Sequence, residues 1–255
     1  MSVFLTVPVL HIERISPHLD FQITDEGGNV VARVDQTSGP RPGWWKRNVF
    51  GGADCSSAMT LNVSSPDGAP LFTLHRYASA NRKNMQTRCR LSGGSGDLLG
   101  SIKIVPDEIV GLSASPFSPS YTFRRRYLLH GSDGRLVGEA VSTPIKVRPR
   151  ATGDTDDGDV DGGGGVVGTV VSTGEHYVIG DASQQELARY EGTRRGLPKK
   201  NSTLRVRPDL PADLRPLVLA VPLAMDLLCP IPQVAGFKNY EDAEAGPDGG
   251  SEQRR

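Results

Sequence analysis

The sequence contains few cysteines and no cysteine motif. Among its 255 residues there are three, Cys55, Cys89 and Cys229, an odd number at wide spacing. No two of them have the two-residue separation that zinc ligands and redox-active cysteines use. The cysteines therefore argue against a disulfide framework, and free thiols favour a reducing, cytoplasmic compartment.

Long hydrophobic runs are also missing. Residues 3–10 are apolar, but this run is short and is interrupted by Pro8, so it predicts a strand rather than a signal peptide. The longest apolar run, residues 217–229, contains Pro222 and Asp226 and is shorter than the roughly 20 residues that a membrane-spanning helix needs. We therefore expect a buried helix there and no transmembrane segment.

The chain has no net charge, because 29 Lys and Arg residues balance 29 Asp and Glu residues. This balance argues against a nucleic-acid-binding protein. Two segments lack the apolar residues that a core requires, and we predict both to be disordered: a Gly/Asp-rich insertion at about 150–165 and an acidic tail at 238–255. Outside residues 151–165 and the tail, 26 basic and 19 acidic residues remain. The predicted folded body is therefore basic, and a basic body suits an anionic partner.

Short runs of alternating apolar and polar residues fill most of the remaining chain. Four of these runs, at residues 21–34, 61–74, 127–138 and 177–188, are each divided by a polar turn rich in Gly, Asp, Asn or Ser. Alternation on both sides of such a turn is typical of a β-hairpin. With single runs between the hairpins, the pattern predicts roughly a dozen strands in a sandwich or barrel.

One helix is expected, near the C-terminus. Its apolar residues from 217 to 228 fall on nearly every face of a helix, Pro222 lies inside it, and Pro230 and Pro232 follow it. A helix that is apolar all round must be enclosed by the rest of the protein. One enclosed helix after a dozen strands indicates a helix threaded through a closed barrel.

The order of these elements resembles a known family. The units FQITDEGGNVVARV (21–34) and YVIGDASQQELARY (177–190), followed by LPADLRPLVLAVPLAMDLL (210–228), are similar to the tubby C-terminal-like superfamily, and within it to the phospholipid-scramblase-like and LURP-one-related branch. The resemblance implies an all-β fold with one helix, a closed barrel of twelve antiparallel strands around a central hydrophobic C-terminal helix. It would make residues 1–237 a single domain.

The chain also departs from that family. The Pro-rich N-terminal region and the lipid-attachment cysteine cluster of scramblases have no counterpart here. Tubby proteins bind phosphoinositide head groups through lysine and arginine, but none of those positions is carried over to this sequence. The acidic insertion at 150–165 lies outside the family pattern.

A calcium site is the first alternative that the residues raise. A twelve-residue EF-hand loop starting at Asp157 would place Asp159, Asp161 and Gly162 correctly, but its last position is Gly168, where a bidentate glutamate is needed. We therefore interpret the aspartate run as a solvated linker. We expect no bound metal.

Catalytic and cofactor motifs are likewise incomplete. The G-x-G-x-x-G pattern at 163–168 lacks the preceding strand and following helix of a dinucleotide site, and residues 93–97 end in Asp97 where a nucleophile elbow needs glycine. No two histidines have metal-ligand spacing, so we expect structural or surface roles for them and no cofactor. The histidines are His11, His18, His75, His130 and His176.

Basic residues near aromatic ones are the remaining candidates. A Trp-Trp-Lys-Arg loop suits a lipid interface, where tryptophans and cations both bind favourably. In the run 124–126, alternation places the middle arginine, Arg125, on the opposite face from its neighbours, and an inward Arg125 would need a partner. The alternative for all of them is core packing or solvated charge. The candidate ligand-binding residues are Trp44, Trp45, Lys46, Arg47, Arg124, Arg125, Arg126, Arg194, Arg195, Lys199 and Lys200.

These observations predict a non-enzymatic module that binds anionic phospholipid or phosphoinositide head groups at the cytoplasmic membrane surface. The first alternative is a soluble protein-interaction or structural module, with a protein partner and regulatory acidic segments. The second is scramblase-type activity, which the enclosed helix disfavours because it leaves no segment to span a bilayer.

Overall fold

The computed structural model describes residues 3–16, 18–40, 57–78, 87–113, 120–149, 168–170, 174–194 and 200–228. Twelve strands form a barrel: β1 (Val9–Arg14), β2 (Phe21–Thr24), β3 (Val30–Ser38), β4 (Met59–Ser64), β5 (Pro70–Arg76), β6 (Arg88–Gly93), β7 (Leu98–Ile104), β10 (Arg126–Gly131), β11 (Leu136–Ser142), β14 (Gly174–Asp181), β15 (Glu186–Arg194) and β16 (Lys200–Val206). A 3-10 helix, η1 (Val3–Leu5), precedes them, and an α-helix, α2 (Arg215–Leu227), follows. The predicted insertion and tail lie outside the described residues.

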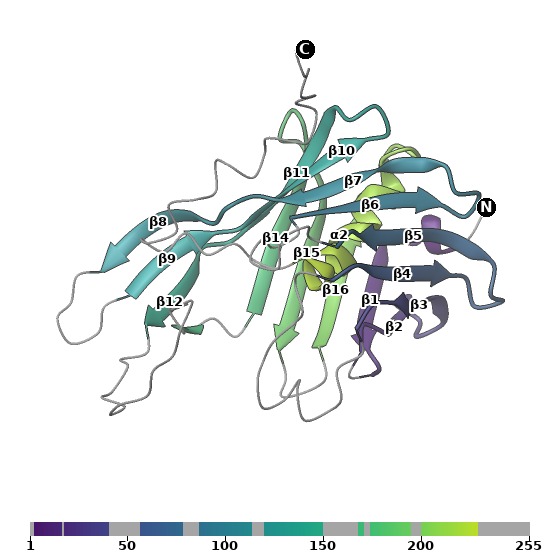
Figure 1. Cartoon of the computed structure of the whole chain (residues 1–255), viewed down its shortest axis with the longest axis horizontal. Coiled ribbons are helices and arrows are strands. Elements are labelled where there is room, and N and C mark those ends of the chain that lie inside the picture. The colour runs from purple at the N-terminus through teal and green to yellow at the C-terminus, as the bar shows by residue number, and fades with distance from the viewer. Residues whose placement is uncertain are drawn as a thin grey trace, which may run out of the picture.

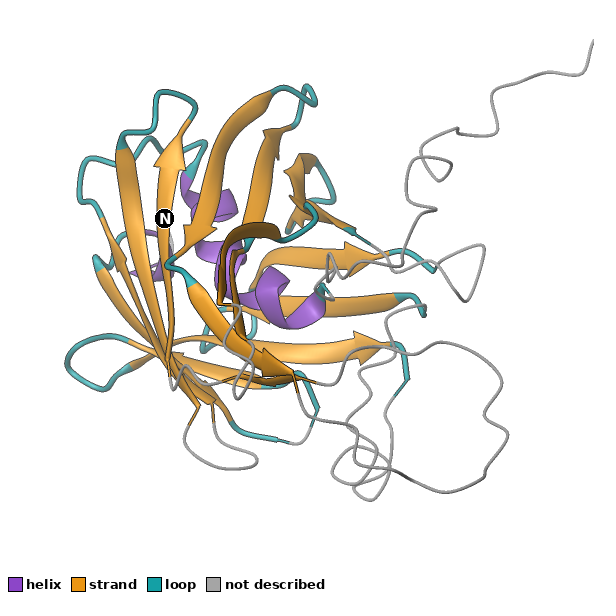
Figure 2. Cartoon of the chain, turned by 90° about the vertical axis from the view of Figure 1, so that its left-hand side faces the viewer, coloured by secondary structure: helices purple, strands orange, loops and turns teal. Residues whose placement is uncertain are grey.

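The barrel is closed and antiparallel throughout. Its order is β1-β16-β15-β14-β11-β10-β7-β6-β5-β4-β3-β2, and β1 closes the ring by pairing with both β16 and β2. Figures 1 and 2 show these strands surrounding α2. The prediction of a closed antiparallel barrel of about twelve strands around a central helix is confirmed.

Five hairpins of one geometry define one end of the barrel, which we call the hairpin end. In the turn after β2, Asp25 N–H donates to Asn29 O and Gly28 N–H donates to Asp25 O, and the other four turns repeat this pair of bonds. Each turn places one residue at positive φ, where glycine is favoured because it has no Cβ. These residues are Gly28, Gly68, Gly96, Gly134 and Gln184.

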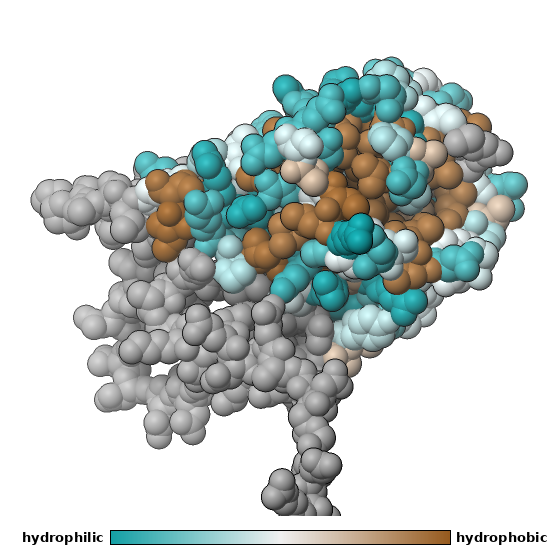
Figure 3. Space-filling view, turned by 90° about the horizontal axis from the view of Figure 1, so that it is seen from above, coloured by the Kyte–Doolittle hydropathy of each residue, from teal (hydrophilic) through white to brown (hydrophobic). Residues whose placement is uncertain are grey.

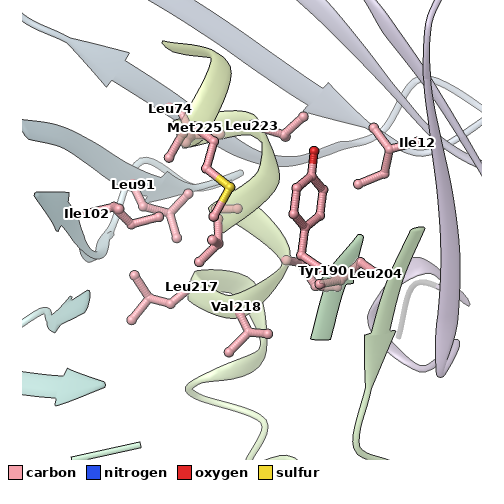
Figure 4. Close-up of a cluster of buried hydrophobic side chains, with 14 of the residues drawn as sticks. Ile12, Leu74, Leu91, Ile102, Tyr190, Leu204, Leu217, Val218, Leu223 and Met225 are labelled. Atoms are coloured by element: carbon pink, nitrogen blue, oxygen red, sulfur yellow. The ribbon is translucent and has the colours of Figure 1, made fainter. Parts of the chain in front are cut away.

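The helix fills the barrel as its composition predicts. Eleven of the thirteen residues of α2 are buried, Pro222 among them. In Figure 4, side chains of α2 such as Leu217 and Met225 point toward side chains from several barrel strands. Packing is close: at Gly100 of β7, a Cβ would lie 3.0 Å from a methyl of Leu217 and 2.3 Å from His130 O. Because a Cβ would not fit here, a glycine occupies this position in the barrel wall.

The C-terminal end of α2 is attached to the wall by a buried arginine. Arg76, the last residue of β5, is 2% exposed, and its Nη1 donates to Leu227 O at 2.6 Å. Its Nε and Nη2 donate to Ser57 O at 3.1 and 2.9 Å. A cation at the end of a helix also interacts favourably with the helix dipole. Alternation alone would have placed an apolar residue at this inward position.

A second, four-stranded sheet extends beyond the barrel, and the sequence did not predict it. Its order is β13-β12-β9-β8, with β8 (Glu108–Ser113), β9 (Ser120–Arg124), β12 (Ile145–Pro149) and β13 (Gly168–Val170). These strands continue β7, β10, β11 and β14 past the barrel rim, as the left of Figure 1 shows. Pro106 and Pro144 lie in two of the interruptions, where the missing N–H breaks the ladder.

No helix in the described part of the chain is long and apolar enough to cross a membrane.

Candidate anion-binding face

Several of the residues selected from the sequence lie outside the described part of the chain. These are Trp44, Trp45, Lys46, Arg47, Arg195 and Lys199. Arg194 ends β15 and Lys200 begins β16, and the two are direct cross-strand partners. The prediction that these residues bind a ligand stays a prediction.

Arg125 joins the barrel to the second sheet. Its Nε donates to Asp107 Oδ1 and its Nη2 to Asp107 Oδ2, both at 3.0 Å, and the two side chains are only 13% and 6% exposed. The Arg125 backbone N–H donates to Ser142 Oγ at 2.9 Å, and its guanidinium lies 5.2 Å from the centre of the Phe123 ring. Asp107 is therefore the partner that an inward Arg125 requires.

The electrostatics of Arg125 agree with a structural role. Burial lowers its pKa, but the hydrogen bonds to Asp107 and the electrostatic interactions with Asp107, Tyr127 and Tyr177 together outweigh this and hold the pKa above its ordinary value. Arg126 donates to Glu139 Oε2 at 2.6 Å and is partly exposed, whereas Arg124 is exposed on β9. The three consecutive arginines thus have three different environments.

Basic side chains do converge on the outer wall formed by β5, β6, β7 and β10. Cross-strand pairing places His75, Arg90, Ser101 and His130 in one row, because each is the partner of the next. The adjacent row contains Arg88 and its partner on β7, Lys103. All of these side chains point outward, since buried residues alternate with them along their strands. We call His75, Arg88, Arg90, Lys103 and His130 the basic face.

Carboxylates are scarce on this face. The first row contains no Asp or Glu from β4 to β10. In the second row, Leu128 of β10 lies between Lys103 and the first carboxylate, Glu139 of β11. Glu139 is bound by Arg126. Arg88 and Arg90 are exposed and form no ion pair with any of the described residues. Arg88 and Arg90 therefore keep their positive charges accessible.

The histidines of the face are held in different ways. His75 Nδ1 is 2.9 Å from Thr60 Oγ1, and its ring meets Tyr77 edge-on at 4.5 Å. His130 Nδ1 is buried and has no hydrogen-bond partner among the described residues. Burial lowers the pKa of His130, and the nearby charges of Arg88 and Lys103 lower it further. A bound anion would offset that repulsion.

Sequence reasoning missed this face because it searched for basic residues adjacent in the chain. Arg88 and Arg90 lie on one face of the same strand, but His75, Lys103 and His130 are single residues on three other strands. The available signal was the outward position of each in its alternating strand. These residues could be grouped into one face only once the order of the strands around the barrel was known.

Metal chemistry finds no support in the described residues, which contain no group of three or more His, Cys, Asp or Glu side chains placed to hold a metal ion. The thiol of Cys89 is buried, and desolvation raises its pKa to about 12, so it is a poor nucleophile.

Comparisons with known proteins leave the function open. No protein-family model matches the sequence, and no curated protein matches it. Among solved structures, the chain is similar to a protein from Arabidopsis thaliana at 16% sequence identity and a TM-score of 0.38, with 88% of this chain and 99% of that chain covered. Similarity at this level carries no argument about what the protein does.

Proposed function

We propose that this chain is a non-enzymatic β-barrel module that binds the phosphate groups of anionic phospholipids or phosphoinositides at the cytoplasmic membrane surface. The observation that carries the proposal is the basic face, with exposed Arg88 and Arg90 next to Lys103 and no nearby free carboxylate among the described residues. The resemblance of the hairpins and central helix to the tubby C-terminal-like superfamily is compatible with it, and membership of that superfamily is part of the proposal.

The magnitude of the attraction follows from the charges. Each lysine or arginine near an anionic bilayer surface contributes about 1 kcal/mol at physiological ionic strength. Arg88 and Arg90 together would contribute roughly 2 kcal/mol, a factor on the order of 30 in membrane partitioning. Exposed charges are screened by salt, so this contribution should fall steeply as ionic strength rises.

Vesicle flotation tests the proposal. The chain should float with vesicles of phosphatidylcholine containing phosphatidylserine or phosphatidylinositol bisphosphate, and not with phosphatidylcholine alone. Arg88→Gln combined with Arg90→Gln should reduce partitioning about thirtyfold, because two cations are removed. Equal flotation with neutral and anionic vesicles would overturn the proposal.

A matched control distinguishes binding at the basic face from a general effect of net charge. Arg189→Gln combined with Arg205→Gln removes the same two charges from β15 and β16, on the opposite wall of the barrel. This variant should float like the unmodified chain. Equal losses in both variants would show a non-specific charge effect and contradict a site on the basic face.

A second candidate, a protein-interaction module, is favoured by one observation. In the second sheet, β8 is an edge strand, and Ile109 and Val110 on it are 43% and 39% exposed. Figure 3 shows an apolar patch toward that end of the molecule. Such an edge is a common site for an added strand. A partner lost on Val110→Lys, together with no flotation on anionic vesicles, would favour this candidate.

Scramblase-type activity receives no support from the described structure. The apolar residues of α2 pack inside the barrel and are not available to a bilayer. We do not extend the proposal to it.

A further inference from the structure

His130 lies beside the cations of the basic face. Its direct partner on β7 is Ser101, and Ser101 pairs in turn with Arg90 of β6. In the adjacent row, Lys103 of β7 lies diagonally across from His130 and pairs with Arg88. Positions two residues apart on a strand are separated by about 7 Å, so the two rows lie within reach of one anionic head group. An anion bound by the arginines would therefore lie close to the imidazole.

Carboxylates on the elements beside this imidazole are already engaged. Glu139 of β11 accepts a hydrogen bond from Arg126 Nη2 at 2.6 Å. In the turn after β10, Asp133 Oδ2 lies 3.5 Å from Arg135 Nε. In the turn between β6 and β7, Asp97 accepts a hydrogen bond from a serine hydroxyl, and the direct partner of the histidine on β11 is a leucine. The described charges that act on the imidazole are therefore the cations of β6 and β7.

These surroundings favour the neutral form of the ring. The Nδ1 atom of His130 is buried and has no hydrogen-bond partner in the described part of the chain. Protonation gives the ring an N–H at both nitrogens, and a buried N–H without an acceptor is costly. Burial lowers the pKa of His130, and the charges of Arg88 and Lys103 lower it further. Without an anion, His130 is therefore mostly neutral at pH 7.

A bound anion reverses this preference. Its negative charge offsets the repulsion between the imidazolium and the neighbouring cations, and its oxygen atoms accept hydrogen bonds from a charged ring. Proton binding and anion binding are then thermodynamically linked, because an anion that increases the proton affinity of the ring must itself bind more tightly to the protonated protein. The same face would therefore have two affinities, one for each state of the histidine.

We propose that the basic face takes up a proton on His130 when it binds an anion, so that anions bind more tightly as pH falls from 7.5 to 5.5. This inference rests on the proposed function, since it concerns the regulation of the same face. An opposite charge next to an ionisable group changes its proton affinity by about tenfold or more. Because the free protein also takes up part of this proton at pH 5.5, we expect binding about fivefold tighter at pH 5.5 than at pH 7.5.

Vesicle flotation at the two pH values and constant ionic strength tests the coupling. The vesicles contain phosphatidylcholine and phosphatidylglycerol, because a phosphodiester keeps one negative charge over this range, whereas a phosphomonoester takes up a proton near pH 6. The unmodified chain should partition about fivefold more strongly at pH 5.5, and His130→Gln should reduce this ratio to below about twofold. The matched control is His11→Gln, which removes an exposed histidine from β1, opposite β7 in the ring, and should keep the full ratio.

NMR of the imidazole measures the proton without any substitution. The Hε1 signal of His130 follows its titration, and glycerophosphoglycerol, a soluble phosphodiester head group, should raise the pKa that this signal reports. No preference for anionic over neutral vesicles at either pH would overturn the proposed function and this inference with it. Anion-specific binding whose pH ratio is the same in the unmodified chain and in His130→Gln, or an unchanged pKa of His130 in the bound state, would overturn this inference alone.

Discussion

Replacing Arg76 by methionine should destabilise the protein strongly, because Arg76 attaches the central helix to the barrel. Methionine keeps a side chain of similar length in a site that is 2% exposed, so little cavity is created. The substitution removes the three hydrogen bonds that the guanidinium donates to Leu227 O and Ser57 O and leaves these carbonyls without those donors.

The magnitude follows from those two carbonyls. A hydrogen bond from a charged group contributes about 1.5–3 kcal/mol, and each buried acceptor left unsatisfied costs about 1–3 kcal/mol. Burial of the apolar methionine offsets part of this loss. We expect Arg76→Met to lower the free energy of unfolding by about 3–4 kcal/mol, which corresponds to a decrease in Tm of about 10 °C for a domain of this size.

Urea denaturation followed by circular dichroism measures this change directly. The control is Arg205→Met, the same substitution at an exposed outward position of β16, which should change stability by less than about 0.5 kcal/mol. A loss below about 1 kcal/mol for Arg76→Met would refute the reasoning, because the end of α2 would then be held by other contacts.

Four further predictions concern single residues. Arg125→Met should cost about 3–5 kcal/mol in urea denaturation, because it leaves the Asp107 carboxylate buried and unpaired, and the double variant with Asp107→Leu should recover much of that loss. Gln184→Gly should raise the free energy of unfolding by about 0.5–1 kcal/mol, since Gln184 has a φ of 63° that glycine adopts without strain; a loss of stability would contradict this. The pKa of His130 is lower in the folded than in the unfolded protein, so the unfolded state gains its proton first and the free energy of unfolding decreases as pH falls through 6.5. The difference in the free energy of unfolding between the unmodified chain and His130→Gln, measured from pH 8 to pH 5 in buffer without multivalent anions, should show this loss. Cys89, whose pKa is raised to about 12 by burial, should react with a thiol reagent at neutral pH only after unfolding. Fast labelling of Cys89 in the native protein, read by mass spectrometry of its peptide, would show that this part of the core is accessible and contradict the prediction.

Local signals account for the part of the fold that was predicted. Three of the four predicted hairpins combine a turn glycine at positive φ with alternating strands, and both signals lie within about fifteen residues of sequence. The helix was recognisable because the apolar residues from 217 to 228 fall on nearly every face, and such a helix must be enclosed by the rest of the protein.

The remaining features depend on contacts between distant residues. Arg76 points inward because it reaches Leu227 O, 151 positions away, and no local pattern contains that partner. The second sheet arises where strands resume beyond Pro106 and Pro144, and no strand was predicted at residues 108–113 or 145–149. The basic face depends on the ring order of β5, β6, β7 and β10, which only the closed barrel defines.

The central claim is that the basic face binds phosphate groups. The most direct test is an amide NMR titration of the chain with inositol 1,4,5-trisphosphate, a soluble phosphorylated head group. We predict that the largest shifts occur at residues 73–76, 88–92, 101–104 and 128–131, and that Arg88→Gln with Arg90→Gln abolishes them. No saturable shifts, or shifts concentrated on β1, β15 and β16, would contradict the account.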